Sequence, residues 1–359
     1  MSLSRWRLPL LCSAAALVLS QLLAPALAGQ SPDWLRNPYN PSALMQKASE
    51  ACQSDRFTFA AFGDSYARTP LISLLEMVDA RSPDFVVTLG DMVDRGSGDR
   101  GMRNWTTLSE RTGWFMRSRP TWPVIGNHEL SEEYQAGLAN YLRFYDLPDQ
   151  NYSFTFRNAK FIVLGLDSEW RLVPPDHLAF LRKELADRDE YDHVFVFRHV
   201  PFYTVGMKGA DQVPNTETEL VKLLNERRVT ATFTGHDHYY YRTRRDGVTH
   251  IISGVSGAGI YNLNRLAEQA PGDAYMGVSA AKDRVVLHIP GRVDRSVPFK
   301  GPFESGDEWL FAVFVHVNGD RVTADTVSMS GEVWDSFVLA GEPFGPTEAA
   351  APATASASP

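Results

Sequence analysis

Five short apolar runs along the chain share one feature: each ends in a polar cluster that contains Gly, Asp, Asn or His. Their β-branched and aromatic residues predict strands, and their near-continuous hydrophobicity predicts sheets that are covered on both faces. The runs comprise residues 57–62, 85–89, 122–125, 193–197 and 229–234.

Segments with helical periodicity fall between these runs. Thr69 and Pro70 have the residue types of a helix cap and a first helical position. Pro175 begins a second candidate helix, and Thr216 with Glu219 forms a capping box before a third. The alternation of strands and helices predicts an α/β fold, in which ligands bind beyond the carboxyl ends of the strands. All five polar clusters are expected at that edge.

The chain after residue 247 has a different pattern. Asn318-Gly319 lies between the apolar runs 311–317 and 322–327 and predicts a hairpin. Further strands are expected at 284–289 and 333–339. We expect this half to be antiparallel and to close a second sheet, without obvious chemistry of its own.

The insertion at 96–120 lies between the second and third apolar runs. Its Gly-rich start predicts a loop. Because it contains Trp105 and Trp114, it is a candidate wall of a substrate mouth.

The two ends of the chain carry different signals. Residues 1–28 have the basic start, apolar run and small-x-small site of a secretory signal. The alternative is a membrane anchor, but Gln21 and Pro25 interrupt the run short of the roughly 20 residues that a spanning helix needs. We therefore expect export to the periplasm or the medium, with no stable membrane insertion. The expected divisions are a signal peptide at 1–28, an N-terminal extension at 29–53, one domain at 54–345 and a disordered tail at 346–359.

Net charge and cysteine content limit the classes of function that the chain can have. The 359 residues include 35 basic and 43 acidic side chains, which gives a formal net charge of −8. Loss of residues 1–28, which contain two arginines and no acid, changes this charge to −10 and removes Cys12, so Cys52 has no partner for an intrachain disulfide. The acidic balance argues against a nucleic-acid binder. An enzyme that acts on anions would need a local source of positive charge.

The polar clusters offer such a source. Together they contain carboxylates, an amide oxygen and imidazole nitrogens, which are ligands that hard and borderline divalent metals accept. A pair of ions also needs a bridging carboxylate, and the set contains enough ligands for two ions. The clusters read Gly63-Asp64-Ser65-Tyr66, Gly90-Asp91-Met92-Val93-Asp94, Gly126-Asn127-His128-Glu129, Arg198-His199 and Gly235-His236-Asp237-His238.

In their order and spacing, the clusters resemble the five motifs of the calcineurin-like metallophosphoesterases over about residues 56–260. The stretch His199-Val200-Pro201-Phe202-Tyr203 is similar to the His-x-Pro-x-Tyr of the purple acid phosphatase branch. The resemblance implies an α/β fold with a two-sheet β-sandwich core flanked by helices. It also implies two transition-metal ions (Fe, Mn or Zn) and a small phosphoester substrate.

The resemblance assigns a ligand set to each ion. The centre stays cationic after its ligands are counted, so it attracts phosphate and lowers the pKa of a bridging water. The bridging ligand is Asp91, the first ion takes Asp64 and His238, and the second ion takes Asn127, His199 and His236.

The resemblance also implies catalytic residues. His128 would bind the phosphoryl group or protonate the leaving oxygen, and Asp94 would orient and charge His128. Arg198, Arg68 and Arg242 lie near motif residues and are candidates for phosphate binding or for structural roles. Of these three, Arg198 is taken as the substrate-binding candidate.

Tyr66 departs from the family pattern. It stands where a histidine ligand is usual, and purple acid phosphatases take their tyrosine ligand from the position of Asp94. One hypothesis is that Tyr66 binds the first ion as a phenolate and favours ferric iron there. The alternative is that Tyr66 lines the pocket and the first ion has fewer protein ligands.

The sequence thus predicts an exported dinuclear-metal phosphohydrolase that cleaves phosphomonoesters by attack of a metal-bridged hydroxide. One alternative is a phosphodiesterase with the same centre. Another is an inactive metal-binding or polymer-binding homologue, and a third is an exported globular protein without metal.

Overall fold

The computed structural model describes residues 31–51, 54–168, 174–206, 219–264, 266, 269–292, 294–299 and 309–341. The expected signal peptide at 1–28 and tail at 346–359 lie outside these residues, as do Cys12, Cys52 and Thr216. All five polar clusters lie within them.

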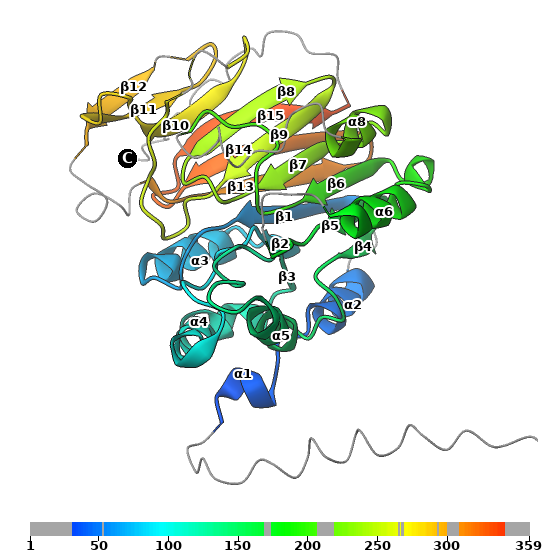
Figure 1. Ribbon diagram of the computed structural model, residues 1–359. Coiled ribbons are helices and arrows are strands. Elements are labelled where there is room, and N and C mark those ends of the chain that lie inside the picture. The colour runs from blue at the N-terminus through cyan, green and yellow to red at the C-terminus, as the bar shows by residue number, and fades with distance from the viewer. Residues whose placement is uncertain are drawn as a thin grey trace, which may run out of the picture.

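One of the two sheets contains the strands that precede the first three clusters (Figure 1). Its six strands run in the order β15-β14-β13-β1-β2-β3. Strands β1, β2 and β3 are parallel, so their carboxyl ends share one edge. The six strands are β1 (Arg56–Phe62), β2 (Phe85–Thr88), β3 (Thr121–Pro123), β13 (Phe311–Asn318), β14 (Arg321–Ser328) and β15 (Val333–Ala340).

The other sheet has nine strands in the order β12-β11-β10-β8-β9-β7-β6-β5-β4. Its centre is parallel from β5 through β6 and β7 to β9, and its remaining pairs are antiparallel. The nine strands are β4 (Tyr152–Phe156), β5 (Ala159–Val163), β6 (His193–Phe197), β7 (Ala231–Thr234), β8 (Tyr240–Arg245), β9 (Val248–Ser253), β10 (Ala274–Val278), β11 (Arg284–His288) and β12 (Arg295–Pro298).

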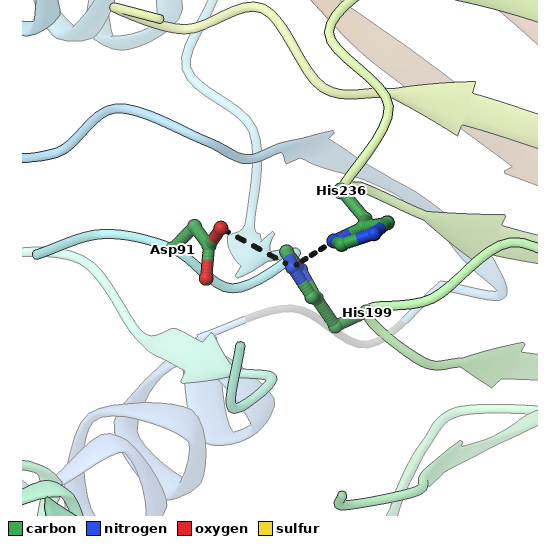
Figure 2. Close-up of side chains that lie close together, drawn as sticks. All are labelled: Asp91, His199 and His236. Atoms are coloured by element: carbon green, nitrogen blue, oxygen red, sulfur yellow. Dashed lines mark hydrogen bonds and ion pairs between the residues drawn. The ribbon is translucent and has the colours of Figure 1, made fainter. Parts of the chain in front are cut away.

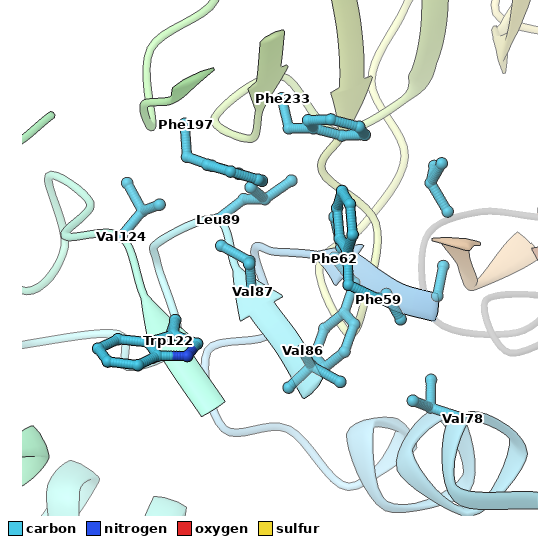
Figure 3. Packing of buried hydrophobic residues seen from close by; sticks show 14 of the residues in the cluster. Phe59, Phe62, Val78, Val86, Val87, Leu89, Trp122, Val124, Phe197 and Phe233 are labelled. Atoms are coloured by element: carbon cyan, nitrogen blue, oxygen red, sulfur yellow. The ribbon is translucent and has the colours of Figure 1, made fainter. Parts of the chain in front are cut away.

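Aromatic side chains fill the space between the two sheets (Figure 3). The ring of Phe59 on β1 meets the rings of Phe161, Phe195 and Phe233 edge-on, with centroids 5.4, 5.2 and 5.7 Å apart. Edge-to-face contacts at such distances are favourable because the positive ring edge meets the negative ring face. The expected two-sheet core is confirmed, and it holds the ligand-bearing strands of both sheets against each other.

Helices flank this core. The expected helices at Pro70 and Pro175 are confirmed, although the Thr69 side chain makes no capping hydrogen bond. No helix among the described residues combines the length and hydrophobicity that crossing a bilayer requires. Within the described part of the chain, the helices are α1 (Asp33–Arg36), α2 (Pro41–Ala51), α3 (Pro70–Ala80), α4 (Gly98–Met116), α5 (Tyr134–Tyr145), α6 (Pro175–Glu184) and α8 (Glu219–Glu226), with a 3-10 turn η1 (Arg188–Glu190).

The prediction of a loop at 96–120 is wrong, because most of this insertion forms the 19-residue helix α4. Gly98, with φ of +64°, marks only the point where the chain turns into the helix. Trp105 is fully buried against Phe144, and its indole N–H donates to the Gly96 carbonyl at 3.0 Å. Trp114 is 43% exposed. The apolar face of α4 packs inward, and this burial favours a helix despite the turn-forming glycines at its start.

The last three strands, β13 to β15, do not form the second sheet that the sequence predicted for this part of the chain. The hairpin at Asn318-Gly319 forms, and β11 and β15 occupy the expected segments. The hairpin does not close a second sheet, however, because β13 pairs antiparallel with β1 and extends the first sheet. Of the strands that follow the last cluster, only β8 to β12 join the nine-stranded sheet. The apolar β1 needs a partner on its other edge, and the buried residues of β13 supply it.

Candidate metal centre

The structure brings the five clusters together at the edge where strands of both sheets end. Figure 2 shows Asp91, His199 and His236 pointing toward one another, although they follow β2, β6 and β7 respectively. Their ligand atoms all lie within 4.8 Å of one another. Each of the three is buried, so no bulk water competes for these ligand atoms.

The donor atoms expected around the second ion form a tight group. The Oδ1 of Asn127 lies 3.1 Å from Nε2 of His199 and 2.9 Å from Nδ1 of His236. The two imidazole nitrogens are 3.2 Å apart, and Oδ2 of Asp91 lies 3.4 Å from Nε2 of His199. Ligand atoms that are each about 2.1 Å from one ion lie about 3.0–3.4 Å apart, so the spacing fits a metal ion.

The residues expected around the first ion form an adjoining group. The Nε2 of His238 lies 3.5 Å from Oδ1 of Asp64 and 3.0 Å from the hydroxyl of Tyr66. The carboxylate of Asp64 also accepts the backbone N–H of His236, at 2.9 and 3.0 Å from its two oxygens. A carboxylate, an imidazole and a phenol suit a harder cation than the imidazole-rich second group does.

Backbone carbonyls fix which nitrogen of two histidines faces the centre. Nδ1 of His199 lies 2.7 Å from the Leu89 oxygen, and Nδ1 of His238 lies 3.0 Å from the Gly259 oxygen. A carbonyl oxygen can only accept, so Nδ1 carries the proton in both rings. In both rings Nε2 is therefore the nitrogen directed at the group of ligands, where a metal ion would take the place of any proton.

The ionisation states of Asp91 and His199 depend on each other. Burial favours neutral Asp91, but the imidazole of His199 and the hydrogen bonds from His199 and His128 hold the Asp91 pKa well below its usual value. Burial likewise disfavours protonated His199, but Asp91 raises its pKa to about 9. The buried carboxylates thus create a negative site that a bound metal cation would neutralise.

The backbone at the strand ends is shaped to direct the ligands inward. Asp64, Asp91 and His236 have φ of +61°, +51° and +68°, in the left-handed region that residues other than glycine rarely adopt. Such strain often clusters at functional sites. A Cβ on Gly126 would lie 2.2 Å from Oδ1 of Asp91, so the glycine of the third motif permits this close approach.

Comparison with known proteins agrees with this geometry. Residues 57–240 match the family model described as calcineurin-like phosphoesterase. The chain belongs to the calcineurin-like phosphoesterase family. The family that the five motifs predicted is thereby confirmed.

Curated relatives of this calcineurin-like phosphoesterase include purple acid phosphatases 18 and 22 of Arabidopsis thaliana. They are 26% and 23% identical to it over 200 residues. Each match covers 52% of this chain and 45% of the relative, so the chain spans less than half the length of these relatives.

Solved structures that share its fold include a plant phosphatase and a Plasmodium protein. The purple acid phosphatase PPD1 from yellow lupin (Lupinus luteus) aligns with a TM-score of 0.56 at 16% identity, over 80% of this chain and 54% of that one. GAP50, described as the anchor in the inner membrane complex of Plasmodium, aligns with a TM-score of 0.56 at 15% identity, over 81% of this chain and 90% of that one.

The contact between His128 and Asp94 differs from the expected carboxylate–imidazole pair. Nδ1 of His128 donates to the main-chain carbonyl of Asp94 at 2.9 Å, whereas the Asp94 carboxylate lies 3.8 Å away. That carboxylate forms an ion pair with Arg100 at the start of α4. Asp94 therefore orients His128 through its backbone, and a catalytic role of its carboxylate stays a prediction.

The three candidate arginines lie in different surroundings. Arg198 is 2% exposed, and its guanidinium lies 5.9 Å from the ring centre of Phe202, which belongs to the hydrophobic cluster beneath α6 and α8. Arg242 pairs with Asp335 at 2.6 Å. Arg68 lies over the ring of Tyr66 at 5.1 Å, and of the three it is the one with a contact to a candidate ligand. Substrate binding by Arg198 stays a prediction without support from these contacts.

Two residues to which the motifs assigned no role also contact the centre. The ring of Tyr261 stacks on His238 with centroids 3.9 Å apart. No local signal in the sequence marks Tyr261, since it lies beyond the last motif. Glu129, the last residue of the third motif, hydrogen-bonds to the backbone of Asp91 and Gly126. Burial, together with the charge of Asp91, raises the pKa of Glu129 above its ordinary value, and the hydrogen bonds from Val93 and Gly126 only partly oppose this rise.

Proposed function

We propose that this chain is an exported, dinuclear-metal phosphohydrolase that acts on phosphomonoesters. One observation carries the proposal: donor atoms of Asp91, Asn127, His199 and His236, from the ends of four strands, converge at the spacing of ligands around one ion. The adjoining Asp64 and His238 offer ligands for a second ion, and Asp91 is the carboxylate proposed to be shared.

The chain's own residues define the chemistry around this centre. Bound metal would supply Lewis acidity toward phosphate oxygens and would activate water. His128 is 29% exposed at its side chain, and its Nε2 lies 3.9 Å from Oδ2 of Asp91. Because Nδ1 is held by the Asp94 carbonyl, Nε2 is the atom that meets a phosphoryl oxygen or exchanges a proton with the leaving oxygen.

The phosphomonoester class rests on the purple acid phosphatase relatives and on the positive charge that two ions would supply. The test combines elemental analysis with hydrolysis of para-nitrophenyl phosphate and of its bis ester. We expect two ions per chain, faster hydrolysis of the monoester, and loss of both metal and activity in Asn127→Ala. The matched control is His316→Ala, a change on the partly exposed face of β13. Faster hydrolysis of the bis ester would instead identify a phosphodiesterase.

The fold of GAP50, described as an anchor, makes a binding protein the second candidate. Apart from the usual histidine at position 66, the chain retains the ligand set that the family implies, and it retains His128, which argues for activity. Two bound ions without hydrolysis of either ester would favour the binding protein. Absence of stoichiometric metal would remove both candidates.

Export is proposed from residues 1–28 alone. N-terminal sequencing of the protein recovered from the native envelope or medium tests it. A mature chain that begins after Ala28 is the expected result. A chain that retains residues 1–28 in the cytoplasm would contradict export.

We further propose that Tyr66 is a ligand of the first ion. Its backbone is left-handed, with φ of +52°, and its hydroxyl lies 3.0 Å from Nε2 of His238. Since Nδ1 of His238 carries the proton, the Tyr66 hydroxyl donates to Nε2, the nitrogen that would bind metal. Burial, Asp91 and Asp64 raise the pKa of Tyr66, so the phenol is neutral until a cation replaces its proton.

A further inference from the structure

Glu129 binds backbone rather than side chains. Its carboxylate is 1% exposed and accepts four backbone N–H groups. Oε2 accepts from Asp91 at 2.8 Å and from Gly126 at 2.7 Å, and Oε1 accepts from Met92 at 2.7 Å and from Val93 at 3.1 Å. A carboxylate has about four lone-pair positions, so these bonds use its full capacity.

These four bonds tie together two loops that belong to different strands. Asp91, Met92 and Val93 follow β2, whereas Gly126 follows β3. The three successive N–H groups after β2 all donate to this one carboxylate, and such a run of donors favours an anion. The Glu129 carboxylate is that anion and so holds the loop of the bridging ligand against the loop of Asn127.

A second contact makes this connection reciprocal. Oδ1 of Asp91 accepts the backbone N–H of His128, the residue after Asn127, at 2.9 Å. The main chain of Glu129 is itself enclosed, because a Cβ on Gly96 would lie 1.6 Å from the Glu129 carbonyl oxygen. The position of the carboxylate is therefore fixed from both sides.

Both oxygens of Glu129 face N–H donors, so neither is directed at a metal ion or a substrate. We propose that Glu129 is a positioning residue whose carboxylate assembles the loops of Asp91 and Asn127 into a metal-binding arrangement before metal arrives. This inference rests on the proposed metal centre. Residues that support metal ligands typically change metal affinity about 10–100-fold when replaced.

The variant that tests it is Glu129→Gln, which keeps the shape of the side chain. Its amide NH2 must face two of the four N–H donors, so two bonds are lost whichever way the amide turns. The matched control is Asp273→Asn. Asp273 is 3% exposed and accepts the backbone N–H of Ala270 at 2.7 Å, away from the metal ligands.

The measurement is the affinity of the chelator-stripped full chain for Zn²⁺, by chelator competition, beside thermal unfolding of the same metal-free samples. We expect Glu129→Gln to bind Zn²⁺ about 10–100-fold more weakly than wild type. Asp273→Asn should lower the unfolding temperature and leave Zn²⁺ affinity unchanged. Wild-type affinity in Glu129→Gln, with only a lower unfolding temperature, would overturn the inference and leave the metal centre standing. A wild-type chain that binds no metal would remove the proposed function and the inference together.

Hydrogen exchange in the wild-type chain keeps the test independent of how the variant folds. If Glu129 assembles the loops in advance, the amides of Asp91, Met92, Val93 and Gly126 are protected before Zn²⁺ is added. Protection that arises only on Zn²⁺ binding would overturn the inference.

Discussion

Nδ1 of His128 lies 2.9 Å from the main-chain oxygen of Asp94 and 3.8 Å from its carboxylate. The backbone of one loop thus sets the tautomer of a side chain on another, and the carboxylate remains paired with Arg100. In a carboxylate–imidazole pair, one carboxylate would both orient His128 and favour its charged form. Here the main-chain carbonyl of Asp94 orients His128 without adding a charge next to it.

Replacement of His128 by alanine should leave metal content at the wild-type level and lower kcat about 10²–10⁴-fold, the range for loss of a general acid or base. The reason is that His128 faces the centre without belonging to either group of ligands. Metal analysis and kcat measured on one preparation check this. Loss of metal in step with loss of turnover would show that His128 supports the ligands instead.

Asp94→Asn should lower kcat less than tenfold, by our estimate from the strength of a retained orienting hydrogen bond. The main-chain carbonyl that orients His128 survives this change, and only the pair with Arg100 is weakened. The ratio of kcat for Asp94→Asn to that for His128→Ala is the quantity to measure. Equal losses in the two variants would assign the orienting role to the carboxylate after all.

Tyr66→Phe removes one hydroxyl and keeps the ring that contacts His128 and Arg68. If the phenol is a ligand, the iron-loaded wild type absorbs visible light through phenolate-to-iron charge transfer, and the variant loses this band. We also expect weaker retention of the first ion on dialysis. An iron-loaded wild type that is colourless and fully active would leave Tyr66 as a residue that lines the pocket.

The free energy of unfolding should depend on pH through His250 on β9, which is not among the candidate metal ligands. Burial, assisted by Arg245, lowers its pKa to about 3. Below about pH 6.5 the unfolded chain therefore binds a proton at His250, whereas the folded chain does not bind it until the pH is near 3. Folding stability falls as the pH drops through the interval from about 6.5 to 3.

His250→Gln should remove this dependence. Between pH 6.5 and 4.5 the wild type should lose on the order of 2–3 kcal/mol more of its unfolding free energy than the variant does. Denaturant unfolding with a chelator present checks it, since metal release then makes no contribution. Parallel curves for the two proteins would contradict the low pKa.

The sequence predicted that the polar clusters share one edge because each cluster follows a strand and parallel strands end at a common edge, whereas the assignment of ligands to two ions came from the family resemblance. Topology brings Asp64 and Asp91 together within one sheet, and the packing of the two sheets brings His236 to them. Tyr261 lies outside any motif, and its stacking on His238 depends on how the chain returns after β9. The contact of His128 with the Asp94 carbonyl was also beyond prediction, because residue types do not distinguish a backbone acceptor from a carboxylate.

Helix α4 shows a different limit. The glycines at its start are turn formers, so the sequence predicted a loop there despite the apolar positions that follow. In the structure, burial of Trp105 against Phe144 decides the conformation. Local preference gave way to packing, and the packing partners lie on other helices.

The pairing of β1 with β13 has a consequence for the order of assembly. Arg56 and Asn318 are 262 positions apart in the chain, yet they are partners in neighbouring strands. Contacts of such long range form late, since loop closure must precede them. Until β13 docks, β1 presents an unpaired edge that invites pairing with other chains. A chain cut short before residue 311 would therefore carry every ligand of the metal centre and still lack a stable strand from which to present Asp64.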